Sequence, residues 1–125
     1  MECEIWIPAA RPDIIRKDNV ARLKTKLVAQ GANIPITAEA EAMLHERGVL
    51  SIPDFIANAG GVICAAVEYH GGGQRLAFET IEEKIRHNTH QVLKDARETG
   101  RTPRAAATAM AERRVRQAMA YRRWS

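Results

Sequence analysis

Three short segments of the sequence combine small residues with asparagine in a way that suits contact with a nucleotide. They are Pro8-Ala9-Ala10, Gly31-Ala32-Asn33, and the run from Pro53 to Val62 that includes Asn58, Gly60 and Gly61. Small residues let a flat ring or a ribose approach the backbone, and an asparagine amide can both donate to and accept from a carboxamide. Each segment taken alone would fit an ordinary turn. The three together indicate a nucleotide crevice.

Each of these segments directly follows a predicted strand. Short apolar runs that end at breakers predict strands at 3–7, 26–30 and 49–52. Between them we expect a short helix that Asp18 caps and a longer one that Thr37 caps and Gly48 ends. Alternation of strands and helices predicts right-handed crossovers in a parallel sheet, whose ligands bind beyond the carboxyl ends of the strands.

Three further helices are predicted in the second half of the chain. The first starts at Gly60-Gly61 and stops before Gly71-Gly72-Gly73, and the second ends at Gly100. The third has Thr102 as its N-cap and Pro103 in its first turn. The expected apolar faces are Phe78, Ile81, Ile85, Val92 and Ala96 on the second helix, and Ala107, Ala111, Val115 and Ala118 on the third.

The length and composition indicate one α/β domain over residues 1–125. A chain of 125 residues with 46% hydrophobic residues can bury one core. We expect a sheet part at 1–73 and two long helices at 74–125, with the triple glycine as the candidate hinge. No run of eighteen apolar residues and no signal-peptide pattern occurs, so the expected location is the cytoplasm, without membrane contact.

The net charge of +4 is concentrated near the C-terminus, where residues 101–125 hold seven arginines and one acid, Glu112. A solvated helix face is the commoner cause of such a pattern, and an anionic partner or nucleic acid is the alternative. Cys3 and Cys64 are far apart and are expected to be ordinary buried thiols. His87 and His90 could share a metal ion, but no third ligand has a suitable spacing, so no metal is predicted.

The ordered segments resemble the glutamate/leucine/phenylalanine/valine dehydrogenase family over most of the chain. The resemblance rests on Ile7-Pro-Ala-Ala, Gly31-Ala-Asn with Pro35 and Thr37, Glu39-Ala40, Gly48, Pro53-Asp54, Asn58-Ala-Gly-Gly-Val through Glu68, Arg104-Ala-Ala and Arg114-Val115. Members of that family convert an L-amino acid to a 2-oxo acid and ammonia with NAD or NADP. The resemblance therefore implies the C-terminal part of a nucleotide-binding domain, with half of a Rossmann-like parallel sheet of about three strands and a helical C-terminal tail.

The resemblance also implies roles for single residues. Ala9 and Ala10 would line the nucleotide site, Asn33 would lie by the nicotinamide ribose, and Gly60 and Gly61 would allow close approach. Asn58 would contact both the carboxamide and the substrate carboxylate. Ala65 stands where glutamate-specific members have a serine that holds the side-chain carboxylate, so an apolar or other amino acid becomes as suitable a substrate as glutamate.

Two family features do not occur in these 125 residues. The Gly-x-Gly-x-x-Gly turn is missing, and no lysine matches the catalytic one, so we assign no catalytic residue. We expect a piece of a larger dehydrogenase that is inactive alone, with the choice between NAD and NADP open. The alternative is a non-enzymatic interaction or oligomerisation module that uses the basic tail, and salt-sensitive binding of DNA or RNA would favour it.

Self-association is expected as well. In the family's sheet the strand that matches Cys3–Ile7 is central, so here one of its edges would be unpaired. Antiparallel pairing of two such strands about a two-fold axis predicts a homodimer. Helix contact through residues 103–123 is the rival geometry.

Overall fold

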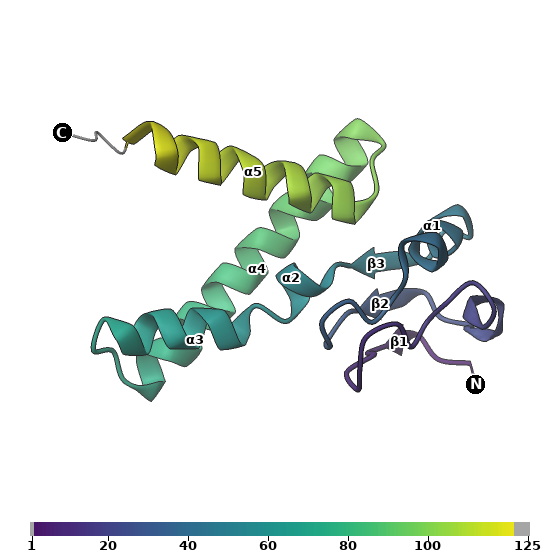
Figure 1. Ribbon diagram of the computed structural model, residues 1–125, viewed down its shortest axis with the longest axis horizontal. Coiled ribbons are helices and arrows are strands. Elements are labelled where there is room, and N and C mark those ends of the chain that lie inside the picture. The colour runs from purple at the N-terminus through teal and green to yellow at the C-terminus, as the bar shows by residue number, and fades with distance from the viewer. Residues whose placement is uncertain (1, 122–125) are drawn as a thin grey trace.

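The computed structural model describes residues 2–121, and its N-terminal half is a small parallel sheet (Figure 1). The strands are β1 (Ile5–Trp6), β2 (Leu27–Ala29) and β3 (Leu50–Ile52), in the spatial order β1-β2-β3. Ile5 is in register with Leu27, and Val28 with Ser51. The predicted α/β fold with three parallel strands is confirmed, although each strand is shorter than expected. Among residues 2–121, β1 pairs only with β2, so it is an edge strand of the described sheet.

The crossovers contain one turn of 3-10 helix, η1 (Val20–Arg22), and the helix α1 (Ala38–Glu46). The predicted cap of α1 is confirmed, because Thr37 Oγ1 accepts from the Ala40 amide at 3.3 Å. The predicted cap of the shorter helix is wrong. Asp18 pairs with the side chain of Arg16 instead, at 3.2 Å, and Asn19 Oδ1 accepts from the Arg16 amide at 2.8 Å.

A first core lies between the sheet, η1 and α1. Trp6 and Met43 pack at its margin. Its buried members are Ile15, Val20, Val28, Ile36, Ala40, Leu44 and Val49. Alternation along β2 puts Val28 into this core, as expected for a strand with one face toward a helix.

Up to residue 121, four helices follow the sheet: α2 (Asp54–Ala57), α3 (Gly60–Tyr69), α4 (Gln74–Thr99) and α5 (Pro103–Tyr121). Figure 1 shows α3 lying along the first part of α4, while α5 begins beside the sheet, crosses α4 and runs away from the sheet. Gly100 ends α4 with a φ of 69°, and Thr102 Oγ1 accepts from the Ala105 amide at 3.2 Å, so both predicted ends are confirmed. The short α2 was not expected.

A second core joins β3 and α2 to α4 and α5. It consists of Ile52, Ile56, Val92, Ala96, Ala106, Ala107 and Met110. The predicted buried face of α5 is wrong beyond Ala107, because Ala111, Val115 and Ala118 are exposed. Only the first half of α5 lies over the core. On α4, Phe78 is 63% exposed and the neighbouring Ala77 takes the buried position.

The three consecutive glycines form the turn between α3 and α4. Gly71 has a φ of 79°, and the Gly72 amide donates to Val67 O at 2.9 Å. A Cβ on Gly72 would lie 2.5 Å from Val67 Cγ1, so this close approach requires glycine. The division of the chain at residue 73 stays a prediction.

The two cysteines are less buried than the sequence predicted. Cys3 and Cys64 are partly exposed, so the prediction of buried thiols is wrong. Cys64 lies on α3, whose outer face has no covering element among residues 2–121.

None of the helices within residues 2–121 is both long and apolar enough to cross a membrane.

Candidate functional site

The segments that follow β1 and β2 are joined directly at the carboxyl edge of the sheet. Pro8 O accepts from the Gly31 amide at 3.1 Å and from the Ala32 amide at 2.8 Å. A Cβ on Gly31 would lie 3.2 Å from Ala9 Cβ, a separation tighter than most real Cβ contacts. Glycine at position 31 therefore lets the segments that follow β1 and β2 approach each other. Ala9 itself is exposed.

The segments that follow β2 and β3 meet through two asparagines. Asn58 Nδ2 donates to Asn33 Oδ1 at 2.8 Å. Asn58 caps the C-terminal end of α2, and its own amide donates to Asp54 O at 2.7 Å. Within residues 2–121, Asn33 Nδ2 and Asn58 Oδ1 have no hydrogen-bond partner. The pair thus presents the Asn33 Nδ2 group and the second hydrogen of Asn58 Nδ2 as free donors, and Asn58 Oδ1 as a free acceptor, at the sheet edge.

The loop that carries Asn33 is held by a buried carboxylate. Ile34 has a φ of 49°, and its amide donates to Asp54 Oδ2 at 2.9 Å. Burial alone would raise the pKa of Asp54, but the Ile34 amide and the charge of Arg104 outweigh burial and lower that pKa below its usual value. Asp54 is therefore an anion that ties the β2 loop to the start of α2.

A second set of polar groups is buried behind this loop. Arg104 of α5 forms an ion pair with Glu41 of α1 through Nε, and its Nη2 donates to Gln30 Oε1 at 3.0 Å. Its Nη1 lies 3.2 Å from Asp54 Oδ1, as an ion pair without hydrogen-bond geometry. Gln30 Nε2 in turn donates to Glu41 Oε1 at 2.9 Å and to Ser51 Oγ at 3.0 Å. We call Gln30, Glu41, Ser51, Asp54 and Arg104 the Arg104 cluster.

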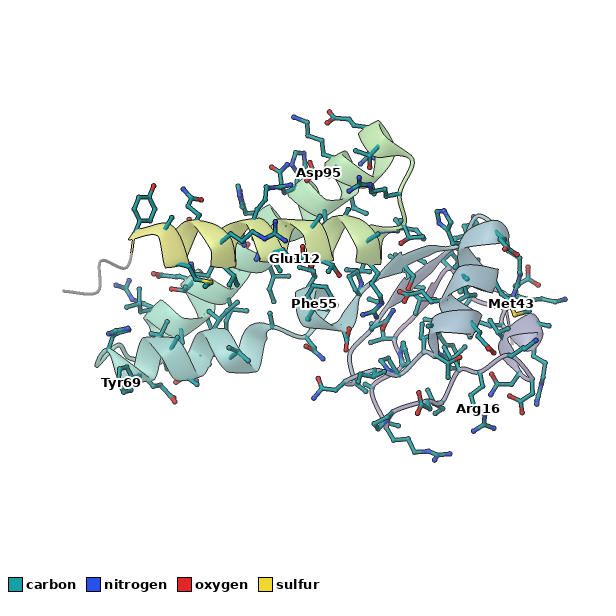
Figure 2. All side chains as sticks on the ribbon, turned by 45° about the horizontal axis from the view of Figure 1, so that its top comes forward. Arg16, Met43, Phe55, Tyr69, Asp95 and Glu112 are labelled. Carbon is teal, nitrogen blue, oxygen red and sulfur yellow. The ribbon has the colours of Figure 1, made fainter. Side chains whose placement is uncertain are left out.

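The Arg104 cluster lies where the sheet part meets α5. Figure 2 shows Phe55 at this junction, and the guanidinium carbon of Arg104 is 5.7 Å from the centre of its ring. The sequence places Asp54 and Arg104 in family-like motifs but does not pair them. The one feature of the sequence that could have suggested this pairing is that charged residues near apolar strands need partners of opposite charge.

The glycines and alanines of the predicted site are placed differently from one another. A Cβ on Gly60 would meet Ile81 Cγ2 at 3.6 Å, which is ordinary contact with α4, and a Cβ on Gly61 would meet nothing within 4 Å. The packing of this chain therefore requires glycine at neither position. Ala10 and Ala65 are exposed. Of the predicted site residues, the structure joins Asn33 to Asn58, and it places Ala9 against Gly31 of the loop that carries Asn33.

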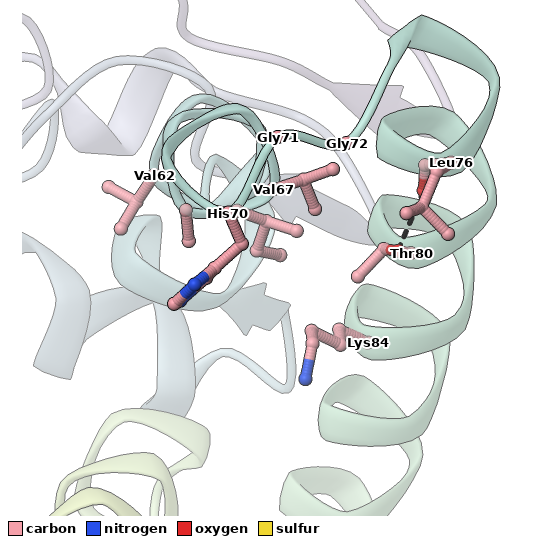
Figure 3. A pocket seen from close by; sticks show the side chains of 10 residues that line it. Val62, Val67, His70, Gly71, Gly72, Leu76, Thr80 and Lys84 are labelled. Carbon is pink, nitrogen blue, oxygen red and sulfur yellow. Dashed lines mark hydrogen bonds between the residues drawn. The ribbon is translucent and has the colours of Figure 1, made fainter.

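Two hollows lie near these elements. Ala9 and Ala10 line one of about 400 Å³, together with Trp6 at the open edge of the sheet. A larger hollow of about 590 Å³ lies between α3 and α4, where Val62, Val67 and Leu76 form an apolar lining (Figure 3). None of the predicted site residues lines it, so we place the candidate site at the sheet edge.

The arginines of α5 mostly contact their own chain. Arg113 pairs with Asp95 at 3.5 Å, Arg114 Nη2 donates to Asn88 Oδ1 at 2.9 Å, and Arg116 pairs with Glu112 at 3.5 Å. This is the arrangement of a solvated helix face rather than of a free basic surface. Across residues 2–121, no three His, Cys, Asp or Glu side chains converge as metal ligands would.

Comparisons with known proteins identify relatives of this chain. The glutamate dehydrogenase of Pyrobaculum calidifontis, named as NADP(+)-dependent, is 36% identical over 98% of this chain and 31% of its own length. The NAD-specific glutamate dehydrogenase of Staphylococcus aureus is 33% identical over 100% of this chain and 32% of its own length. The chain thus spans about a third of the length of these relatives.

A solved structure and a family match complete the comparison. L-tryptophan dehydrogenase from Nostoc punctiforme superposes with a TM-score of 0.86 at 28% identity, over 94% of this chain and 36% of that one. Residues 1–123 match the family described as Glutamate/Leucine/Phenylalanine/Valine dehydrogenase. The motifs, the parallel sheet and these matches agree, and the chain belongs to the glutamate/leucine/phenylalanine/valine dehydrogenase family.

Proposed function

We propose that this chain forms one wall of the nucleotide and substrate crevice of an amino-acid dehydrogenase. The observation that carries the proposal is the hydrogen-bonded pair of Asn33 and Asn58 at the carboxyl edge of the parallel sheet. Dinucleotides bind at this edge in open α/β folds. The chain would act as part of a larger protein, as its length relative to the named relatives suggests.

The free atoms of the asparagine pair suit a nicotinamide nucleoside. Asn33 Nδ2 can donate to a ribose hydroxyl, and Asn58 Oδ1 can accept from a carboxamide NH₂. The second hydrogen of Asn58 Nδ2 remains for the carboxylate of the substrate. Ala9, Ala10, Gly60 and Gly61 would let the cofactor approach the backbone, since none carries a bulky side chain.

When bound, the dinucleotide would accept a hydride from the α-carbon of an L-amino acid. Water would then add to that carbon and the nitrogen would leave as ammonia, which gives a 2-oxo acid. The residues of this chain would bind and orient the reactants. We assign none of them a proton-transfer role. NAD and NADP both remain candidates, because the relatives named above include one enzyme of each kind.

Ala65 bears on the choice of substrate. It is exposed on α3, and its methyl group cannot hydrogen-bond to a side-chain carboxylate. We therefore propose that an apolar amino acid suits this position at least as well as glutamate does. A site that lacks a hydroxyl loses discrimination in favour of polar side chains.

Self-association through β1 is also proposed. In the described part of the chain one edge of β1 has no partner strand, and Ile5 and Ile7 next to it are exposed. Pairing with the β1 strand of a second copy would satisfy these backbone groups.

An assay of the purified chain tests the proposal. We expect no reduction of NAD or NADP above background with glutamate, leucine, phenylalanine, valine or tryptophan, and weak dinucleotide binding in an NMR titration. The signals of Asn33 and Asn58 should shift most. Turnover in a pure sample, or millimolar dinucleotide without any shift at the sheet edge, would sink the proposal.

The intact parent enzyme offers a sharper comparison. Asn58→Ala should lower kcat/KM by roughly tenfold or more, because the lost amide contacts the reacting groups. Cys64→Ala is the matched control on α3 and should leave kcat/KM within about twofold. Equal losses for the two variants would contradict the placement of Asn58.

A further inference from the structure

We propose that Arg104 is a positioning residue for the asparagine pair, although it touches neither asparagine. It acts from α5 through Asp54 and Ile34. The functional meaning of this inference rests on the function proposed above for Asn33 and Asn58.

The guanidinium group of Arg104 joins three elements of the fold. Each of its nitrogens faces a different element: Nε faces Glu41 of α1, Nη2 faces Gln30 after β2, and Nη1 faces Asp54 of α2. A planar fork with donors at fixed angles can meet three such partners at once, whereas an ammonium group is a single point charge. Arg104 therefore fixes the relative positions of the segments that follow β2 and β3.

Asp54 depends on its ion pair with Arg104. Asp54 Oδ1 is buried and, among residues 2–121, accepts no hydrogen bond, so the charge of Arg104 is its compensation. A buried carboxylate that loses its counter-charge must take up a proton or turn toward water. Either change weakens the hydrogen bond that Asp54 Oδ2 accepts from the Ile34 amide.

Ile34 has an unusual backbone conformation. A β-branched residue with a φ of 49° is held in a conformation that it would leave if released. Asn33 is the adjacent residue, and its Oδ1 lies 2.8 Å from Asn58 Nδ2. Relaxation of Ile34 toward a negative φ would move Asn33 and separate the pair. The ion pairs of α5 thus hold the geometry of the crevice.

The test uses NMR of the full chain with Arg104→Met and Arg104→Lys. In Arg104→Met we expect hydrogen exchange of the Ile34 amide to accelerate by roughly tenfold or more, and the side-chain amide signals of Asn58 to move toward those of a free amide. Arg104→Lys keeps the charge but loses the fork, so it should show a smaller change in the same direction. It also keeps the test decisive if Arg104→Met does not fold.

Two controls separate positioning from general destabilisation. Arg113→Met removes a more exposed arginine of the same helix, whose partner is Asp95, and should change neither signal. Val92→Ala lowers global stability through the second core and should leave the Asn58 amide shifts unchanged. The inference is overturned if a folded Arg104→Met, or a folded Arg104→Lys where Arg104→Met does not fold, keeps wild-type exchange at Ile34 and wild-type Asn58 shifts.

A dinucleotide titration keeps the two proposals distinct. If the wild type does not bind NAD or NADP, the proposed function fails, while the NMR comparison still decides the role of Arg104. If the wild type binds, Arg104→Met should weaken binding by at least about threefold, and Arg113→Met should bind as the wild type does. Equal binding by all three proteins would overturn the link between Arg104 and the crevice.

Discussion

Ile34 has the most unusual backbone conformation of the residues near the site. Its φ of 49° costs a β-branched residue about 1–2 kcal/mol. Its side chain is 61% exposed, so little packing is lost when it is removed. We therefore expect Ile34→Gly to raise the free energy of unfolding by about 0.5–1 kcal/mol, after subtraction of the extra freedom of glycine in the unfolded chain. The midpoint of urea denaturation at constant slope measures this gain.

Ile7 provides a matched control for that substitution. It is 62% exposed and precedes a proline, as Ile34 does, but its φ is not positive. Ile7→Gly should lower the free energy of unfolding by about 0.5–1 kcal/mol, because glycine adds freedom to the unfolded chain and no strain is relieved. Destabilisation by both variants would show that Ile34 stores no strain.

The charge of Asp54 makes the free energy of unfolding depend on pH in the acid range. Its pKa in the folded chain is lowered, so its charge stabilises the fold above the ordinary aspartate pKa of about 3.9. That contribution is lost as the pH falls from about 4 through the lower, folded pKa. We expect the urea midpoint of the wild type to fall over this range. Asp54→Asn should be less stable at neutral pH and should lose less on acidification.

Asp18 serves as the control, because its pKa is also lowered, by Arg16, but on the exposed surface. Asp18→Asn should leave the acid profile almost unchanged at moderate salt, where exposed pairs are screened. A smaller loss on acidification with Asp18→Asn than with Asp54→Asn would contradict the assignment.

The difference between predictable and unpredictable residues has a physical reason. Asn33 and Asn58 could be placed together from the sequence, since the ends of neighbouring parallel strands meet at one edge. The partners of Arg104 could not. Glu41 and Asp54 are two of many acidic residues, and only the packing of α5 on the sheet part selects them.

At the scale of elements, the turn between α3 and α4 makes the sharpest demand on residue type. A Cβ on Gly72 would lie 2.5 Å from Val67 Cγ1 and 3.1 Å from Val67 O, so the turn would have to open. We expect Gly72→Ala to lower the free energy of unfolding by about 1–3 kcal/mol. Gly73→Ala is the control, because a Cβ there would meet nothing within 4 Å and the φ is −90°. It should be neutral or stabilise by up to about 1 kcal/mol. Similar losses in both variants would mean that glycine flexibility, and not close approach, matters in this turn.

The ends of the helices were predictable where a residue has a local reason to end them. Thr37, Thr102 and Gly100 cap their helices through contacts within a few residues. The buried face of α5 was not predictable, because alanines occur on several of its sides, and of the arginine-free stripe Ala107, Ala111, Val115 and Ala118 only Ala107 is buried. Its inner face is set by where it crosses α4, which is a long-range property.

At the scale of the whole molecule, the buried apolar residues form two separate cores. The first belongs to the sheet and α1, the second to β3 and the later helices, and the Arg104 cluster bridges them. Both the asparagine pair and this bridge lie at the junction. The geometry of the proposed crevice would therefore depend on how firmly the sheet part and the helical part are held together.

Self-association also belongs to this scale, and the molecule offers two surfaces for it. The edge of β1 has exposed Ile5 and Ile7 beside it. The outer half of α5 exposes Val115 and Met119 over a hollow of about 470 Å³. β1 is only two residues long, so edge pairing would require the flanking residues of 3–7 to extend the ladder. We nevertheless expect two copies to associate through β1, because pairing gives its unpaired backbone groups hydrogen bonds as well as apolar contact.

Sedimentation of two variants beside the wild type decides between these surfaces. Ile5→Pro removes a ladder donor from the edge strand, and we expect it to weaken dimerisation by roughly tenfold or more while circular dichroism remains that of the folded chain. Met119→Glu places a charge on the outer half of α5, far along the chain from β1, and should leave the dimer intact. The edge model requires this order of effects, because each substitution disturbs one surface only. If Met119→Glu is monomeric and a folded Ile5→Pro is as dimeric as the wild type, the copies associate through α5 and the sheet edge stays unpaired.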